Sequence, residues 1–179
     1  MARPLVFDTT PLIYMIRASL TQALKRLDNP KLLPQTVYEE MLVGETHGKP
    51  EAGVLRGLVE EGAITVIHPS SALLVARLIK ISVEAENMPL HRAEAEALVI
   101  AKELDAILIA DDHAARMTAK LVEVECHGTG YMLGTMYQRG QISKDVAIRK
   151  VTEMRRAGWR LSEDDYRTVL DYLKALQPM

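Results

Sequence analysis

The sequence predicts an α/β fold, a three-layer α/β/α sandwich with a central parallel sheet of about four to five strands, followed by C-terminal helices. Two observations support this fold class. Short apolar runs alternate with longer segments of helical periodicity along most of the chain. The strand-like runs are apolar at consecutive positions, which is typical of strands that helices cover on both faces of a parallel sheet.

The first predicted strand covers residues 5–7 and ends at Asp8. Thr10 and Pro11 provide an N-cap and a proline in the first turn, so a helix is expected over residues 10–27. An extended connector is expected next at 31–34, followed by helices over 35–43 (ending at Gly44) and 51–61, a strand at 63–67 and a helix from Ser70 or Ser71 to about 85. After a turn at 87–90, helices and strands are expected to alternate: a helix over 91–104, a strand at 106–110, a helix over 113–121, a strand at 122–126 and a helix over 131–138.

Two more helices are expected after Gly140. Ser143 and Ser162 are suitable N-cap residues, and the acidic run after Ser162 favours a helix start because it complements the helix dipole. We therefore predict a main domain over residues 1–139 and a helical extension over residues 140–179 that packs on the same domain.

Composition narrows the classes of function. The chain has 179 residues and a formal net charge of −2, so it is not a generally basic nucleic-acid binder, although local basic patches remain compatible. A single cysteine excludes an internal disulfide, and the absence of a signal-like or membrane-spanning segment predicts a cytoplasmic protein. The apolar helix faces between residues 10 and 61 exceed what one sheet face needs, which predicts a homodimer.

Acidic residues lie where predicted strands end. Asp8 follows the first strand, and Asp111 and Asp112 follow the strand at 106–110. The carboxyl ends of parallel strands meet at one edge of the sheet, where open α/β proteins place their chemistry. Two acidic pairs on predicted helices could join them there, namely Glu39 with Glu40 and Glu94 with Glu96.

Clustered carboxylates repel one another and are stable only with cations between them. Mg²⁺ and Mn²⁺ prefer oxygen ligands and keep several waters, which leaves room for a phosphodiester. Such an ion polarises the phosphate and activates a water, and a second ion would also stabilise the leaving oxygen. Each acid alone has a simpler role as a cap or a solvated charge. The combination predicts a metal-dependent nuclease and leaves the number of ions open.

The order of these segments resembles the PIN-domain ribonucleases, the fold of VapC-type toxins, in the branch with a Glu-Ala-Glu helix and a strand ending in Asp-Asp. The matching segments are residues 7–13, 37–40, 90–97, 108–116 and 157–162. The resemblance implies a PIN-like fold, cleavage of RNA with Mg²⁺ or Mn²⁺, and an antitoxin protein as a candidate partner. Ala93 stands where the family usually has a glycine before the glutamate, and a helix accommodates this alanine well.

The resemblance also implies roles for the acids. Glu40 is preferred to Glu39 because the family's acid usually lies four residues before a glycine, here Gly44. The spacing after the strand favours Asp112 slightly over Asp111. The expected metal ligands are Asp8, Glu40, Glu94, Asp111 and Asp112, and the expected catalytic residues are Asp8, Glu40, Glu94 and Asp112.

Two further residues are expected to contact the substrate. Thr10 resembles the family's small hydroxyl residue that braces the first aspartate, and Arg116 lies one turn after Asp112, where it could contact a phosphate. Glu96 lies two residues from Glu94 on a helix and points elsewhere, so both can reach the site only if one of them acts at its rim. The basic residues of the C-terminal tail fit either an RNA contact or a solvated helix face.

Two other classes of function stay open. A catalytically weak PIN-like module that binds proteins would keep the fold, but it would not need clustered carboxylates. A phosphatase with an aspartate nucleophile could use Asp8, but that chemistry favours a second aspartate where Thr10 stands. The metal-dependent endoribonuclease is therefore the leading prediction.

Overall fold

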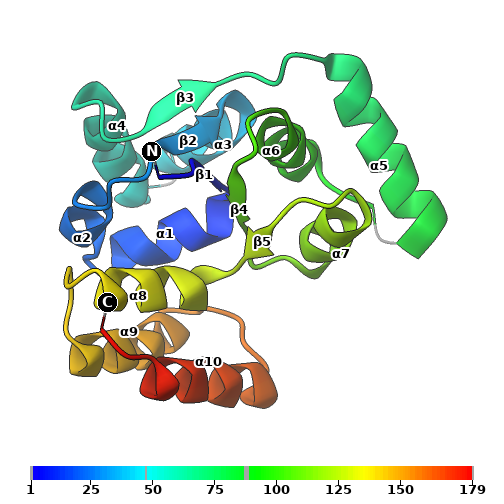
Figure 1. Ribbon diagram of the computed structural model, residues 1–179. Helices are drawn as coiled ribbons and strands as arrows, with labels where there is room; N and C mark the ends of the chain where they lie inside the picture. The colour runs from blue at the N-terminus through cyan, green and yellow to red at the C-terminus, as the bar shows by residue number, and fades with distance from the viewer. Residues whose placement is uncertain (1, 47, 87–88, 179) are drawn as a thin grey trace.

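The central sheet has five parallel strands in the part of the chain that the computed structural model describes, residues 2–46, 48–86 and 89–178. Helices cover both of its faces, so the predicted α/β fold class is confirmed (Figure 1). The strands are β1 (Leu5–Phe7), β2 (Lys31–Pro34), β3 (Thr65–Ile67), β4 (Ile107–Ile109) and β5 (Cys126–His127), arranged in the order β3-β2-β1-β4-β5.

The two central strands contribute to a separate core on each face of the sheet. Leu5 and Phe7 of β1 belong to one core, whereas Val6 belongs to the other. In β4, Leu108 pairs with Val6 and shares its core. Successive side chains of a strand point to opposite faces, so consecutive apolar residues are needed when both faces are buried.

The helices are divided between these two cores. The larger core lies under α1 (Thr9–Arg17), α2 (Thr21–Lys25), α3 (Gln35–Thr46), α4 (Glu51–Glu60), α8 (Thr129–Gln138), α9 (Lys144–Arg156) and α10 (Glu163–Ala175). The smaller core lies under α5 (Ala72–Glu86), α6 (Arg92–Glu103) and α7 (His113–Leu121).

Several predicted element boundaries are wrong. The helix expected over 10–27 is divided into α1 and α2, because the chain turns at Ser19, where φ is +56°. The strand expected at 122–126 starts only at Cys126, because the turn that ends α7 occupies residues 122 and 123, with Glu123 at φ +56°, and pairing with β4 begins at Cys126. Gly44 lies inside α3 instead of ending it, and α8 begins at Thr129 instead of residue 131. The turn expected at 87–90 falls partly outside the described residues.

The C-terminal helices begin at the predicted caps. The Ser143 hydroxyl accepts a hydrogen bond from the Val146 amide at 3.3 Å, and the Ser162 hydroxyl accepts one from the Asp165 amide at 3.0 Å. Figure 1 shows α8, α9 and α10 stacked together at the bottom of the view. Leu173 of α10 is fully buried in the larger core, so the extension shares that core. The domain boundary after residue 139 stays a prediction.

Most of the apolar side chains that suggested a homodimer are buried inside the chain, although Val43 and Val54 are exposed. Leu12, Leu24 and Leu55 are buried in the larger core, which α8, α9 and α10 also cover. The homodimer stays a prediction, without support from these faces. No helix in the described part of the chain combines the length and apolar character needed to cross a membrane.

Candidate active site

The strand order places a crevice between the carboxyl ends of β1 and β4. From β1 the chain proceeds to β2 on one side of the sheet and later returns to β4 on the other side. Such a switch in strand order is where open α/β sheets bind their ligands. Asp8 follows β1 here, and its amide donates a hydrogen bond to the Ile109 carbonyl at 2.9 Å. This bond fixes the backbone of Asp8 beside the end of β4.

Asp8 is buried, with only 5% of its surface exposed. The pKa of its carboxyl is raised to about 7, mainly by burial and in part by the negative charges of Glu94, Asp111 and Asp112. A hydrogen bond from the Thr9 backbone acts in the opposite direction. The structure therefore brings Asp8 within electrostatic reach of three acids that are distant in the sequence.

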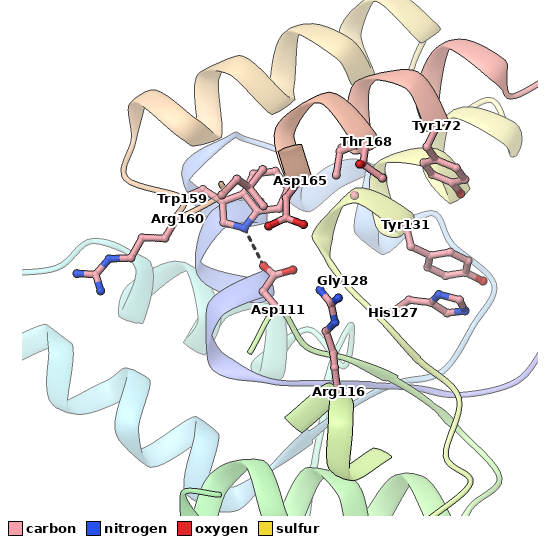
Figure 2. Close-up of a pocket in the computed structure, with 13 residues that line it drawn as sticks. Asp111, Arg116, His127, Gly128, Tyr131, Trp159, Arg160, Asp165, Thr168 and Tyr172 are labelled. Carbon is pink, nitrogen blue, oxygen red and sulfur yellow. Dashed lines mark hydrogen bonds between the residues drawn. The ribbon is translucent and has the colours of Figure 1, made fainter. Parts of the chain in front are cut away.

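Asp111 is held by three hydrogen bonds. The Thr129 amide donates to Oδ1 at 2.8 Å, and the Thr129 hydroxyl donates to Oδ2 at 2.7 Å. The indole N–H of Trp159, a buried residue between α9 and α10, donates to Oδ2 at 2.9 Å (Figure 2). Burial raises the pKa of Asp111, although these hydrogen bonds and the Arg116 charge oppose the shift. The carboxylate is thereby fixed in orientation.

The Asp111 carboxylate also leaves little room for a side chain at position 128. A Cβ atom added to Gly128 would lie 2.6 Å from Asp111 Oδ1. The φ of Gly128 is −97°, which any residue can adopt. The close approach of the carboxylate, and not the backbone conformation, therefore explains why a glycine suits this position.

Asp112 has a different local role. It is exposed, and its Oδ1 accepts a hydrogen bond from the Ala115 amide at 3.0 Å, which caps the N-terminus of α7. Its charge nevertheless raises the pKa of both Asp8 and Glu94. Both members of the Asp111–Asp112 pair thus face the acidic site, one held rigidly and one at the surface.

Glu94 and Glu40 reach the site from helices. Burial raises the pKa of Glu94, and the charges of Asp112 and Glu40 add to this effect. The backbone amide of His91 opposes it by donating to Glu94 Oε2 at 2.8 Å. Glu40 is exposed on α3, and the Thr9 hydroxyl donates to its Oε2 at 3.4 Å. Thr9 therefore links Glu40 to the start of α1.

Glu39 and Glu96 have other partners. Glu39 is exposed and accepts a hydrogen bond from the Gln35 side chain at 2.7 Å. Glu96 is buried and accepts hydrogen bonds from the Thr36 hydroxyl at 2.6 Å and from Arg92 Nε at 2.9 Å. The acids that the structure groups electrostatically are Asp8, Glu40, Glu94, Asp111 and Asp112.

The donor set fits a hard divalent cation. Carboxylate oxygens are the ligands that Mg²⁺ and Mn²⁺ prefer, and a buried aspartate among other acids is stabilised when a cation offsets the repulsion. Among the residues that the structure describes, no three Asp, Glu, His or Cys side chains lie close enough together to bind one metal ion at the same time. Glu40 and Asp112 are exposed, so their side chains can rotate toward a bound ion.

The two predicted substrate-binding residues lie on either side of the acids. Thr10 lines a cavity of about 460 Å³ together with Asp111 and Asp112. Arg116 is exposed on α7 and lines a second cavity, of about 560 Å³, which also contains Asp111 (Figure 2). Thr9, not Thr10, provides the backbone hydrogen bond to Asp8.

Sequence reasoning missed the residues that hold Asp111. Thr129 lies in a Gly-Thr-Gly run that is too short for a dinucleotide fingerprint, and Trp159 occupies a break between two helices. One signal was available. The Gly-Thr-Gly run follows a strand-like segment, as Asp8 and Asp111 do, so the sequence could have placed it at the same edge of the sheet.

Comparisons with known proteins agree with this architecture. The family model DUF3368, described as a PIN domain, matches residues 4–175. The structure of VapBC-1 from nontypeable Haemophilus influenzae is similar with a TM-score of 0.54 and 14% identity, covering 70% of this chain and 97% of that one. PAE2754 from Pyrobaculum aerophilum is similar with a TM-score of 0.51 and 16% identity, covering 76% and 98%. A search of curated proteins finds no match. Because the family model covers nearly the whole sequence, this chain belongs to the PIN domain family.

Proposed function

We propose that this protein is a divalent-metal-dependent endoribonuclease. The observation that carries the proposal is the placement of Glu94, Asp111 and Asp112 around Asp8 at the crevice between β1 and β4, close enough for the charge of each to raise the pKa of Asp8. PIN domains are generally nucleases, and an acidic crevice of this kind suits phosphodiester hydrolysis. A module that only binds proteins has no evident use for a buried aspartate among other acids.

Five carboxylates would hold Mg²⁺ or Mn²⁺ in this proposal. Asp8 and Asp111 are the rigid members, Glu94 is half-buried, and Glu40 and Asp112 are exposed and able to adjust. When bound, the ion would supply a water of lowered pKa and would neutralise charge on the phosphate. The choice of Glu40 over Glu39 agrees with the separate hydrogen bond of Glu39 to Gln35.

The chain's own residues would orient the substrate. The Arg116 guanidinium can donate two parallel hydrogen bonds to a phosphate at the edge of the acidic site. The Thr10 hydroxyl lies in the adjoining cavity and can hydrogen-bond a sugar or phosphate oxygen. The hydrogen bonds from Thr129 and Trp159 would keep the Asp111 carboxylate from rotating when the ion binds to it.

Replacing Asp8 tests the proposal directly. Asp8→Asn removes the buried charge but keeps the shape, and we expect cleavage of single-stranded RNA in Mg²⁺ or Mn²⁺ to fall by at least about 100-fold. The measurement is cleavage of a labelled RNA in gels, with and without EDTA. Asp145→Asn, at an exposed position at the start of α9, is the matched control and should cleave normally. Cleavage by Asp8→Asn at the parental rate, or unaffected by EDTA, would refute the proposal.

We further propose that this chain acts as the toxin of a toxin–antitoxin pair and that an antitoxin protein is its partner. The support is the fold that it shares with VapBC-1. A small DNA-binding protein encoded next to this chain and copurifying with it would agree with the proposal. A chain that cleaves RNA without toxicity when expressed would contradict it.

A further inference from the structure

The larger of the two cavities beside the acids is bounded by the C-terminal extension. Its volume is about 560 Å³, within the range of sites for small ligands. Asp111, Trp159 and Arg160 line both this cavity and the one that contains Thr10. The open space therefore continues on both sides of the Asp111 carboxylate, so a chain-like substrate can extend past the acids in both directions.

Two opposite charges face this cavity. Arg116 points into it from α7, and among the described residues its guanidinium forms no ion pair (Figure 2). Asp165 of α10 also lines the cavity, and its carboxylate accepts a hydrogen bond from the Ser162 hydroxyl at 2.7 Å. A ligand that satisfies both must carry an anionic group for Arg116 and hydrogen-bond donors for Asp165.

An aromatic pair forms another part of the wall. The rings of His127 and Tyr131 are stacked, with centroids 4.0 Å apart and planes within 9° of parallel. They lie on the β5–α8 side of the cavity, next to Gly128 and Gly130, which add no side chains to it (Figure 2). Flat aromatic surfaces beside a cation are the usual elements of a site for an unpaired nucleobase.

We propose that this cavity is a subsite for one nucleotide that flanks the scissile phosphate. Arg116 contacts its phosphate, the ring pair of His127 and Tyr131 stacks on its base, and Asp165 accepts hydrogen bonds from the base. The proposal rests on the proposed nuclease function. It assigns base preference to the C-terminal extension, because α10 contributes Asp165. Bases that present an amino group are favoured over uracil, and the base must be unpaired to reach the rings.

Binding can be measured separately from cleavage. In the full chain carrying Asp8→Asn, with EDTA present, fluorescence anisotropy reports the binding of a labelled single-stranded RNA. We expect Arg116→Ala and Tyr131→Leu each to weaken binding about 5- to 50-fold. Tyr131→Phe, which keeps the ring, and Arg167→Ala, an exposed arginine of α10 outside the cavity lining, should change it less than about 2-fold.

Base preference provides the second measurement. In an otherwise fixed RNA, each nucleotide is replaced in turn by uridine, and we expect the replacement to weaken binding at one position of the RNA. The Asp165→Asn variant should show a smaller difference in affinity between the original RNA and the RNA with uridine at that position. Unchanged affinity in Arg116→Ala and Tyr131→Leu, or equal losses in Tyr131→Phe and Tyr131→Leu, would overturn the subsite. If these variants weaken binding while the parent cleaves no RNA, the cavity binds a nucleotide as proposed and the nuclease function fails.

Discussion

Asp111 shows how a single carboxylate is fixed before any ligand arrives. Its three hydrogen bonds come from Thr129, at the start of α8, and from Trp159, which precedes α10. A carboxylate held in this way has little rotational freedom left to lose when it binds a cation or orients a neighbouring ligand. Because the carboxylate is closely surrounded, a larger residue beside it is expected to displace it.

Gly128→Ala tests this restriction. The new Cβ atom would lie 2.6 Å from Asp111 Oδ1, so the carboxylate must move and its hydrogen bond with the Thr129 amide must lengthen. We expect a loss of RNA cleavage of about 10- to 100-fold, typical of a disturbed partner of a metal ligand. The measurement is the rate of cleavage at saturating Mg²⁺.

Gly57→Ala is the matched control for this substitution. Gly57 lies in α4, and a Cβ there would meet nothing within 4 Å. Alanine should therefore leave cleavage unchanged and raise the free energy of unfolding by about 0.5–1 kcal/mol. Normal activity in Gly128→Ala would show that the position of Asp111 is not important for the reaction.

At the scale of elements, α8 connects the site to the C-terminal extension. Thr129, the first residue of α8, forms hydrogen bonds with Asp111, and Gly134 later in the same helix faces α10. A Cβ on Gly134 would lie 2.6 Å from the Tyr172 hydroxyl and 2.8 Å from Leu176 Cδ1. The two helices thus approach closely where the side chain is absent, and this contact fixes the wall of the larger cavity.

Gly134→Ala should weaken the packing of α10 on α8. Helix propensity favours alanine by about 1 kcal/mol, but overpacking of a close contact costs about 1–3 kcal/mol. We expect a net decrease in the free energy of unfolding, measured by urea denaturation. Gly53→Ala in α4, where a Cβ would meet nothing within 4 Å, should instead be stabilising. Equal effects of the two substitutions would contradict the close packing of α8 against α10.

At the scale of the whole molecule, the acidic site opposes folding when no cation is bound. Asp8 has a pKa of about 7 in the folded protein, against an ordinary value of 3.8. Between these values the folded protein holds a proton that the unfolded chain has released. The free energy of unfolding therefore falls as the pH rises through this window, by up to about 1.4 kcal/mol per pH unit.

The part of this dependence that comes from Asp8 should disappear in Asp8→Asn, whereas Glu94 and Asp111, whose pKa values are also raised by burial, keep their own contribution. In EDTA, the parent should lose about 2–3 kcal/mol relative to Asp8→Asn between pH 5 and pH 7, because the asparagine cannot ionise. Urea denaturation at several pH values measures the difference. Mg²⁺ at pH 7 should stabilise the parent more than Asp8→Asn, since binding to the folded state alone adds stability. Parallel pH profiles for the two proteins would contradict the assigned pKa shift.

Much of the fold could be predicted from local patterns. The apolar strands at 5–7 and 107–109 lie within predicted strands, and the caps at Ser143 and Ser162 are where the sequence predicts them. These features depend on neighbouring residues alone, such as a hydroxyl three residues before an amide. The turn at Ser19 was not predictable in this way, because a serine stands where the positive φ of the turn favours a glycine. The amides of Ser19 and Leu20 close the turn by donating to the carbonyls of Ile16 and Met15, each at 2.9 Å.

By itself, the sequence determined the class of fold and the acids at the strand ends, because burial on both faces and the carboxyl edge of a parallel sheet follow from local pattern. Tertiary structure alone decided how the acids are held. The indole of Trp159 reaches Asp111 only because α9 and α10 pack against α8, and Glu96 is directed to Thr36 and Arg92 although it lies two residues from Glu94. Contacts between distant segments depend on how the helices pack, which no local pattern specifies.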